Sequence, residues 1–185
     1  GKTTFTINLI AKLKGVAVSV FDTETNKFRY LEKLMCCLTG VTDKGIRTKD
    51  RQATIDVKNK LYLLNNYNIN IIDKSGPSIK DMETELKMHS PRVLVIDYFQ
   101  NLEIPGGLNR YAEYTNLARN IEKLTKQYGC TTIIASQLKK PLEPNSRPSK
   151  FDFKETGKLG EMARVAMLLS HIDGEDEESE LFVDI

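Results

Sequence analysis

The sequence contains few residues of the kinds that bind transition metals or form disulfides. Among its 185 residues are three cysteines, Cys36, Cys37 and Cys130, and two histidines, His89 and His171. No two of the cysteines have the spacing of a CxxC pair. We therefore expect neither a zinc site nor a disulfide framework, and the pattern favours a reducing, intracellular setting.

Long hydrophobic runs are also absent. No apolar segment approaches the roughly 20 residues that span a bilayer, so we expect no membrane association. Hydrophobic residues make up 40% and charged residues 28% of the chain, which is typical of soluble globular proteins. The length fits a single domain over residues 1–185 that buries about 70% of the unfolded chain's surface. The chain begins with neither an initiator methionine nor a signal peptide, and we expect it to be truncated at both ends.

Charge of neither sign prevails. The net charge is +2, from 27 Lys and Arg against 25 Asp and Glu, and this balance neither requires nor excludes nucleic acid. The charges are unevenly placed, because residues 138–150 are mainly basic and residues 173–180 are almost entirely acidic. We expect the acidic run to be a solvated turn between two strands. The proline-containing segment 139–150 has no periodicity and is expected to be a long functional loop.

Helix and strand patterns alternate along the chain. Apolar residues at helical spacing predict helices, and β-branched or continuous apolar runs predict strands. The predicted helices are 3–14, 27–38, 78–88 and 109–128, and the predicted strands are 16–21, 69–72, 92–96, 131–135, 165–170 and 181–185. This order predicts an α/β domain with three layers around a mostly parallel sheet. In such sheets, ligands bind at the carboxyl ends of the strands.

The first four residues, Gly1-Lys2-Thr3-Thr4, match the second half of a phosphate-binding P-loop. In such a loop, backbone N–H groups and the start of the following helix hold phosphate oxygens. Lys2 would reach the β- and γ-phosphates, and the Thr3 hydroxyl would ligate Mg²⁺. The alternative is an ordinary helix that begins after a glycine and exposes its lysine.

A carboxylate ends the most apolar of the predicted strands. Val93-Leu94-Val95-Ile96 is followed directly by Asp97, and a carboxylate at the tip of a buried strand is costly unless it meets a cation. Mg²⁺ would meet this requirement, although an aspartate after a strand also serves as a turn cap. Together with the P-loop half, Asp97 indicates a nucleoside-triphosphate site.

Hydrolysis of a nucleotide requires a group that orients the attacking water. Asp22 and Glu24 both lie where the first predicted strand ends, and they share a face of an extended chain. Their spacing alone does not choose between them. Gln137 follows the predicted strand 131–135 and could contact the γ-phosphate through its amide. For each of these residues the alternative is a polar side chain at a strand end or surface turn.

The order of these motifs resembles the ATPase domain of DnaB-type hexameric replicative helicases. The motifs are GKTT at the start, FDTET, VLVIDYFQ, ASQL and FDFKETGKLGEMA. RecA-type recombinases share the GKTT, a glutamate and an aspartate at a strand end, but do not usually combine them with the other segments. The resemblance covers most of the chain and implies a RecA-like P-loop NTPase fold.

The resemblance also implies roles for individual residues. Glu24 matches the family's catalytic glutamate, which favours it over Asp22, and Asp97 matches the Mg²⁺-associated aspartate. Gln137 matches the glutamine that links the state of the γ-phosphate to the DNA loops. Lys154-Glu155-Thr156-Gly157 is similar to the segment that contacts the single-stranded DNA backbone, and a lysine and an N–H group beside Gly157 suit phosphate. The alternative for this segment is an ordinary turn before a helix.

The family pattern further implies ATP and Mg²⁺ as cofactors and single-stranded DNA as the track. It implies a hexameric ring with ATP between neighbouring subunits, primase and a helicase loader as partners, and a bacterial, phage-infected or organellar setting. Met162-Ala163-Arg164 stands where the family often has acidic residues, so we assign it no role. The family's trans-acting Lys-x-Arg pair follows the strand that resembles 181–185, so we expect the given segment to be a weak ATPase. A RecA- or RadA-type recombination ATPase and a regulatory ATP-binding module are the alternative functions.

Overall fold

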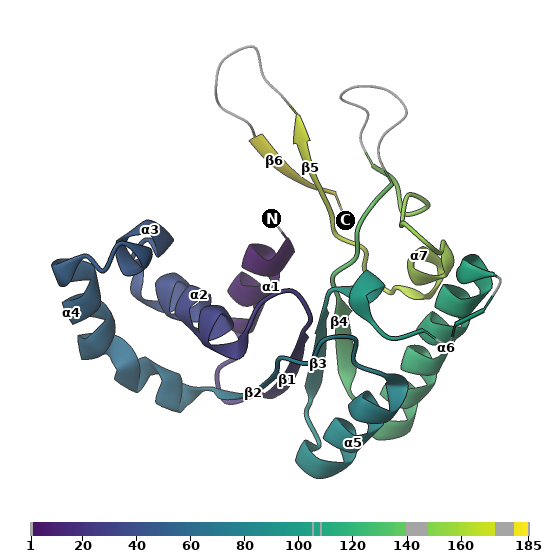
Figure 1. Cartoon of the computed structure of the whole chain (residues 1–185), viewed down its shortest axis with the longest axis horizontal. Helices are drawn as coiled ribbons and strands as arrows, with labels where there is room; N and C mark the ends of the chain where they lie inside the picture. The colour runs from purple at the N-terminus through teal and green to yellow at the C-terminus, as the bar shows by residue number, and fades with distance from the viewer. Residues whose placement is uncertain (1, 105, 108, 140–147, 173–179, 185) are drawn as a thin grey trace.

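A parallel sheet forms the centre of the computed structural model, which describes residues 2–104, 106–107, 109–139, 148–172 and 180–184. Its four strands lie in the order β2-β1-β3-β4 and all run in the same direction (Figure 1). The strands are β1 (Ala17–Asp22), β2 (Asn68–Ile72), β3 (Val93–Asp97) and β4 (Thr131–Ile134). Asp22 of β1 and Asp97 of β3 are register partners. The carboxyl ends of these two central strands therefore place two carboxyl groups side by side.

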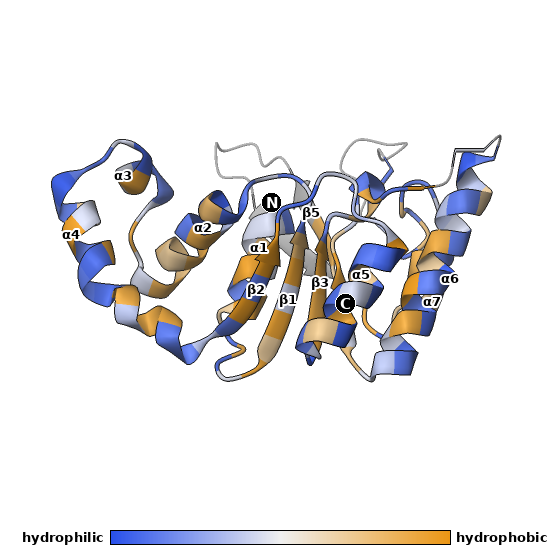
Figure 2. Cartoon of the chain, turned by 60° about the horizontal axis from the view of Figure 1, so that its bottom comes forward, coloured by the Kyte–Doolittle hydropathy of each residue, from blue (hydrophilic) through white to orange (hydrophobic). Residues whose placement is uncertain are grey.

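Helices cover both faces of this sheet. On one face lie α1 (Lys2–Ile10) and α2 (Lys27–Thr39), and on the other lie α5 (Ile79–His89) and α6 (Arg110–Tyr128). Successive side chains of a strand point to opposite faces, so Val93 and Val95 join the core under α1 and α2, whereas Leu94 and Ile96 join the core under α5 and α6. Figure 2 shows the apolar residues concentrated in the strands and on the helix faces turned toward them. The predicted three-layer α/β fold with a parallel sheet is confirmed.

Local capping signals place the ends of the two helices on the second face. The Ser78 hydroxyl accepts a hydrogen bond from the Asp81 N–H, and the Asp81 carboxylate accepts one from the Ser78 N–H. These two backbone N–H groups have no partner within α5, and this capping box satisfies both of them. The Asn109 side chain caps α6, which ends at Gly129 with a left-handed φ of 61°. The predicted helices 78–88 and 109–128 are confirmed to within a residue or two.

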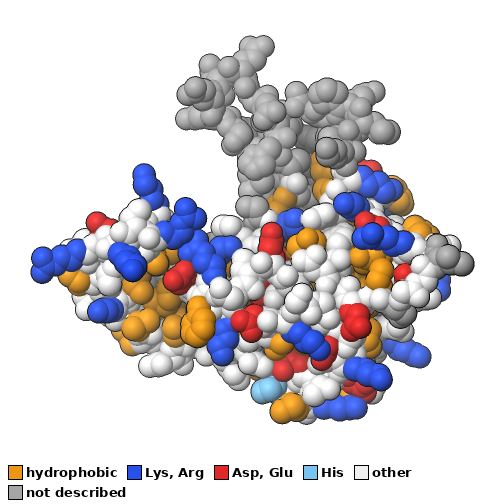
Figure 3. Space-filling model, in the orientation of Figure 1, with side chains coloured by type: hydrophobic (Ala, Val, Ile, Leu, Met, Phe, Trp, Pro, Cys, Tyr) orange, Lys and Arg blue, Asp and Glu red, His pale blue; other side chains and the backbone are white. Residues whose placement is uncertain are grey.

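The region between α2 and β2 differs from the sequence prediction. It contains α3 (Asp43–Arg47), α4 (Arg51–Lys60) and the 3₁₀ helix η1 (Leu61–Asn66), which extend away from the sheet. No residue of these three elements is buried. A helix that buries no face does not need apolar residues at helical spacing, which is the pattern by which a helix is recognised in a sequence. Leu61 is 47% and Tyr62 63% exposed, and Figure 3 shows apolar and basic side chains together over this lobe.

The C-terminal part forms a small separate sheet. After α7 (Lys158–Met162), strands β5 (Leu168–Ile172) and β6 (Glu180–Asp184) pair antiparallel and do not join the four-stranded sheet. Both late strands were predicted, although β5 begins three residues later than expected. Most of the acidic run and most of segment 139–150 lie outside the described residues. Within the described part of the chain, no helix is long and apolar enough to cross a membrane.

Candidate nucleotide site and DNA-facing segment

The sequence-predicted site residues gather at the carboxyl edge of the sheet. Lys2 and Thr3 open α1, Asp97 ends β3, and the Lys2 Nζ lies 5.4 Å from the centre of the Tyr98 ring. The start of α1 and the end of β3 therefore meet, although they are far apart in the sequence. Gly1 lies outside the described residues, and Thr4 is an exposed residue of the first turn of α1.

Asp97 is the most unusual group at this edge. Its side chain is fully buried, and its Oδ2 lies 3.3 Å from the Thr6 hydroxyl, which also donates to the Thr3 carbonyl at 2.9 Å. Its Oδ1 is buried and makes no hydrogen bond of good geometry, although the Thr3 hydroxyl is near enough to lower the pKa of the carboxyl group. Among the described residues, the Tyr30 hydroxyl is the one other buried side-chain atom without such a bond. Buried polar atoms are almost always paired, so an unpaired carboxylate oxygen indicates a site that a cation would complete.

The electrostatics of Asp97 support the same interpretation. Burial raises the pKa of its carboxyl group, and the hydroxyls of Thr3 and Thr6 oppose this rise only in part. The negative charges of Asp22 and Glu24 raise the pKa further. Three acidic groups, Asp22, Glu24 and Asp97, are thus close enough at this edge for their charges to interact. Within the described residues, no three His, Cys, Asp or Glu side chains are grouped to hold a metal, so a cation here would need other oxygen ligands as well.

The structure distinguishes Asp22 from Glu24 by their contacts. Asp22 is buried, and its Oδ1 accepts hydrogen bonds from the backbone N–H groups of Glu24 at 3.2 Å and Thr25 at 3.0 Å. Its Oδ2 accepts a further hydrogen bond from the Thr25 hydroxyl. Both Asp22 oxygens therefore stabilise the turn after β1. The Glu24 side chain is exposed in this turn and is therefore accessible from solvent.

Gln137 lies just beyond β4 and is joined to the segment that contains Lys154. The Lys154 N–H donates to the Gln137 carbonyl at 2.9 Å, and Leu138 and Phe153 form an antiparallel bridge. The Gln137 N–H donates to the side chain of Gln100 at 3.1 Å. The predicted γ-phosphate-contacting residue and the predicted DNA-contacting residue are therefore neighbours in the fold.

The Lys154-Glu155-Thr156-Gly157 segment is anchored to α6. The Glu155 carboxylate lies 3.2 Å from the Arg110 guanidinium, and the hydroxyls of Thr156 and Thr115 are 3.0 Å apart. Thr156 is buried and its hydroxyl accepts a hydrogen bond from the Lys158 N–H, which closes the turn before α7. Glu155 has a φ of 74°, an uncommon conformation for a residue with a side chain.

This anchoring separates two kinds of residue in the segment. The Glu155 carboxylate forms an ion pair with Arg110 and so helps to hold the segment against α6. The Lys154 side chain is exposed, and Gly157 stands at the cap position of α7. A phosphate contact by Glu155 would therefore use its backbone N–H, which lies in the same segment as Gly157.

Several residues of the site were not predicted from the sequence. Thr6 lies one turn after Thr3 on α1, a spacing of three that a helical projection could have detected. Thr23 and Gln100 belong to the FDTET and VLVIDYFQ motifs, but their contacts, like that of Arg110 with Glu155, are with residues far away in the sequence. The Thr23 hydroxyl accepts a hydrogen bond from the Tyr98 N–H at 3.0 Å and so joins the turn after β1 to the end of β3.

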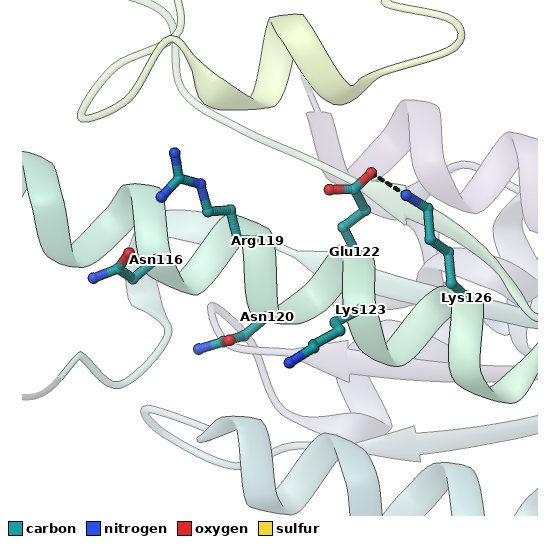
Figure 4. Close-up of a pocket in the computed structure, with 6 residues that line it drawn as sticks. All are labelled: Asn116, Arg119, Asn120, Glu122, Lys123 and Lys126. Atoms are coloured by element: carbon teal, nitrogen blue, oxygen red, sulfur yellow. Dashed lines mark hydrogen bonds and ion pairs between the residues drawn. The ribbon is translucent and has the colours of Figure 1, made fainter.

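A hollow of about 540 Å³ lies elsewhere, on the surface of α6. Figure 4 shows its polar lining side chains spread along the outer face of this one helix, with an ion pair of 2.6 Å between Glu122 and Lys126. Its six lining residues are Asn116, Arg119, Asn120, Glu122, Lys123 and Lys126. These residues all belong to one solvated helix face, and none of them is a residue predicted to bind nucleotide or DNA.

Comparisons with known proteins agree with the motif order. The family model of the DnaB-like helicase C terminal domain matches residues 1–183. The chain is 27% identical to the replicative DNA helicase DnaB of Buchnera aphidicola over 98% of its own length and 42% of that protein. It is 25% identical to the replicative DNA helicase DnaC of Bacillus subtilis, again over 42% of that protein. The chain thus spans less than half the length of these curated relatives.

Two solved structures share the fold. The ATPase domain of the G40P protein superposes with a TM-score of 0.85 at 23% identity, covering 98% of this chain and 71% of that one. A DnaB-like replicative helicase, described with its interactions with primase, superposes with a TM-score of 0.84 at 20% identity, covering 98% of this chain and 52% of that one. The family model matches nearly every residue, and the chain therefore belongs to the DnaB-like helicase C-terminal domain family.

Proposed function

We propose that this chain is the ATP-hydrolysing motor domain of a replicative DNA helicase and that residues 1–185 form one RecA-like ATPase domain. The observation that carries the proposal is the unpaired, buried Oδ1 of Asp97 at the edge where Lys2 and Thr3 begin α1. Family membership supports the same function. The activity of the whole protein is part of the proposal, because the chain covers 42% of its curated relatives.

The residues at this edge suit a magnesium-bound nucleoside triphosphate. Lys2 and the backbone of Gly1 to Thr4 would hold the phosphates, as helix N-termini do for anions. Thr3 and Asp97 would hold Mg²⁺, which usually binds one or two protein oxygens together with phosphate oxygens and water. When bound, Mg²⁺ neutralises charge on the phosphates.

Glu24 is the group we propose to act on the attacking water. Its carboxylate would accept a proton from the water or orient it, because Asp22 is occupied by three hydrogen bonds within the turn. The Lys2 ammonium would stabilise the negative charge that accumulates on the transferred phosphoryl oxygens. Gln137 would sense the γ-phosphate from the end of β4.

The DNA contact is proposed at Lys154 and at the backbone around Glu155 and Gly157. An exposed lysine and backbone N–H groups bind phosphates without reading sequence. A second copy of the chain would complete the ATP site, as in a hexameric ring. We further propose primase and a helicase loader as partners, and a bacterial or phage-infected cell as the setting, because the curated relatives are bacterial.

The test is ATP-dependent unwinding of a forked DNA duplex by the full-length protein. We expect unwinding that requires ATP and Mg²⁺ and that is lost in the Lys2→Ala variant, which removes the phosphate-binding ammonium. Lys12→Ala is the matched control, because Lys12 lies just after α1, away from the carboxyl edge of the sheet. We expect this variant to unwind the forked duplex normally. Strand exchange without unwinding would instead favour a recombination ATPase of the RecA or RadA type.

A further inference from the structure

Gln100 lies three residues beyond Asp97, in the 3₁₀ helix η2 (Phe99–Asn101), and its amide forms three hydrogen bonds. Its Nε2 donates to the Ser136 hydroxyl at 2.9 Å and to the Lys154 carbonyl at 3.3 Å. Its Oε1 accepts from the Gln137 N–H at 3.1 Å. One side chain therefore joins the end of β3, the end of β4 and the Lys154 segment.

These bonds meet where two distant stretches of backbone already pair. The Lys154 N–H donates to the Gln137 carbonyl at 2.9 Å, and the Lys139 N–H donates to the Asp152 carbonyl at 2.7 Å. This pairing fixes the Lys154 segment to the end of β4, which main-chain hydrogen bonds of 2.9 Å between Ala135 and both Ile96 and Phe99 join to the end of β3, but it makes no direct bond from the segment to η2. Gln100 supplies that second link, from a residue 54 positions away from Lys154 in the sequence.

The backbone that carries Gln100 is itself firmly held. Phe99 is fully buried, and its ring lies 5.5 Å from that of the buried Tyr114. The Tyr114 hydroxyl donates to the Gln100 carbonyl at 2.9 Å. Close-packed cores transmit displacements instead of absorbing them, so a shift of this short helix would reach the Gln100 amide.

The same backbone is connected to the other side of the nucleotide site. The Asn101 side chain donates to the Thr23 carbonyl at 3.2 Å, and the Thr23 N–H donates to the Asp97 carbonyl at 2.8 Å. Thr23 directly precedes Glu24. Segment 97–101 thus contacts the Glu24 turn through Asn101 and the Lys154 segment through Gln100.

We infer that Gln100 is a positioning residue that couples the nucleotide site at Asp97 to the location of the Lys154 segment. The inference rests on the proposed function and adds to it a residue with no predicted contact to nucleotide or DNA. The amide is suited to this role because it donates to one backbone group and accepts from another. Neither an apolar side chain nor a carboxylate can do both.

Two variants separate the bonds of this amide. Gln100→Leu removes all three hydrogen bonds at similar volume. Gln100→Glu keeps an acceptor for the Gln137 N–H, but its carboxylate repels the Lys154 carbonyl. Gln127→Leu is the matched control, because Gln127 is an exposed glutamine on α6. Unfolding of each variant by urea shows whether it is folded under the assay conditions, and Gln100→Glu serves if Gln100→Leu fails to fold.

The first measurement is hydrogen exchange of the full-length protein with and without a non-hydrolysable ATP analogue and Mg²⁺. We expect the analogue to change exchange of the peptide 149–157 in the wild type and in Gln127→Leu. In the Gln100 variants this change should fall to less than a third, while exchange of α5 stays the same. An undiminished change in Gln100→Glu, or no change in the wild type, would overturn the inference whether or not the protein binds DNA.

The second measurement is the effect of the same analogue on the affinity for single-stranded DNA. Coupling between two binding sites is reciprocal, so a ratio of DNA Kd values with and without the analogue reports it directly. We expect a ratio of fivefold or more in the wild type and within twofold of one in the Gln100 variants, with the Kd of the analogue itself unchanged. Retention of the wild-type ratio in both variants would overturn the coupling role. Failure of the wild type to bind DNA would contradict the proposed function, and the exchange result alone would then decide the inference.

Discussion

Replacing Asp97 with asparagine should stabilise the nucleotide-free protein and abolish its response to Mg²⁺ and ATP. The Asp97 carboxylate is fully buried, with one oxygen unpaired and one accepting a hydrogen bond of 3.3 Å. An unsatisfied buried polar group costs about 1–3 kcal/mol, and more when it is charged. Asparagine has the same shape and keeps an acceptor for the Thr6 hydroxyl, but it carries no charge. We therefore expect Asp97→Asn to raise the free energy of unfolding by about 1–2 kcal/mol, or roughly 2–8 °C in Tm for a chain of this size.

The pH dependence of this effect has a defined sign. The pKa of Asp97 is raised by burial, so the folded protein holds this proton more tightly than the unfolded chain does. The stabilisation from the protonated group is present at low pH and is lost as the pH rises through the folded-state pKa. The advantage of Asp97→Asn should accordingly be largest near pH 7 and shrink toward pH 4. Urea unfolding of both proteins over this range measures the difference.

Ligand binding provides the second half of the test. A ligand at a concentration of 100 Kd stabilises the folded state by about 2.7 kcal/mol, which corresponds to a rise of roughly 5–11 °C in Tm for a domain of this length and to a smaller rise for a longer chain. We expect a stabilisation of about 2.7 kcal/mol with Mg²⁺ and ATP in the full-length wild type, and its loss in Asp97→Asn.

Asp22→Asn is the matched control for Asp97→Asn, because Asp22 is the adjacent buried carboxylate and accepts three hydrogen bonds. Its replacement turns an acceptor into a donor that faces donors, which should cost about 1–3 kcal/mol of unfolding free energy. If Asp97→Asn destabilised the nucleotide-free protein as much as Asp22→Asn, the unpaired oxygen would not be the dominant effect and the reasoning would be refuted.

Four further outcomes are expected. Glu24→Gln should retain the thermal shift with Mg²⁺ and ATP but slow ATP hydrolysis by about 10²–10⁴-fold. An unchanged steady-state rate of hydrolysis would show that Glu24 has no catalytic role. Gln137→Ala should bind ATP normally and lose DNA-stimulated hydrolysis, and unchanged stimulation in a phosphate-release assay would contradict its role as a sensor. Lys154→Ala should weaken binding to all single-stranded sequences alike and reduce the slope of log affinity against log salt by about 0.7, whereas a sequence-selective loss would argue against backbone contact. The pKa of Asp81 is lowered to about 2, chiefly by its hydrogen bond to Lys74 and to a smaller extent by its hydrogen bonds to Ser78. The contribution of the ionised carboxylate to the free energy of unfolding is fully present above the ordinary pKa of aspartate and is lost as the pH falls toward 2. Asp81→Asn should therefore cost about 1 kcal/mol at pH 7 and little near pH 2 in urea unfolding, and an equal cost at both pH values would rule out this ion pair as the cause.

Much of the architecture was predictable because its signals are local. The continuous apolar run of β3 predicted a central strand covered on both faces, and the structure buries every residue of it. The predicted starts of α5 and α6 agree with the structure because Ser78, Asp81 and Asn109 cap these helices through side chains that act within one turn. Helices α3 and α4 were not predicted. They bury no residue, and so their sequences do not need the apolar spacing that reveals a helix.

The candidate site divides in the same way. The order of the strands predicted that Asp97 and Gln137 lie at one edge of the sheet, because parallel strands end together. The sequence does not show that Asp22 is hydrogen-bonded while Asp97 keeps an unpaired oxygen, because the hydrogen bonds of Asp22 form only in the folded turn after β1.

The motifs that contain Gln100, Ser136 and Lys154 are visible in the sequence, but the hydrogen bonds that join them span 36 to 54 residues and form only in the folded chain. Periodicity and capping arise from forces between residues a few positions apart, and a sequence displays them directly. The pairing of distant polar groups depends on how the sheet brings strand ends together, and the tertiary structure alone reveals it.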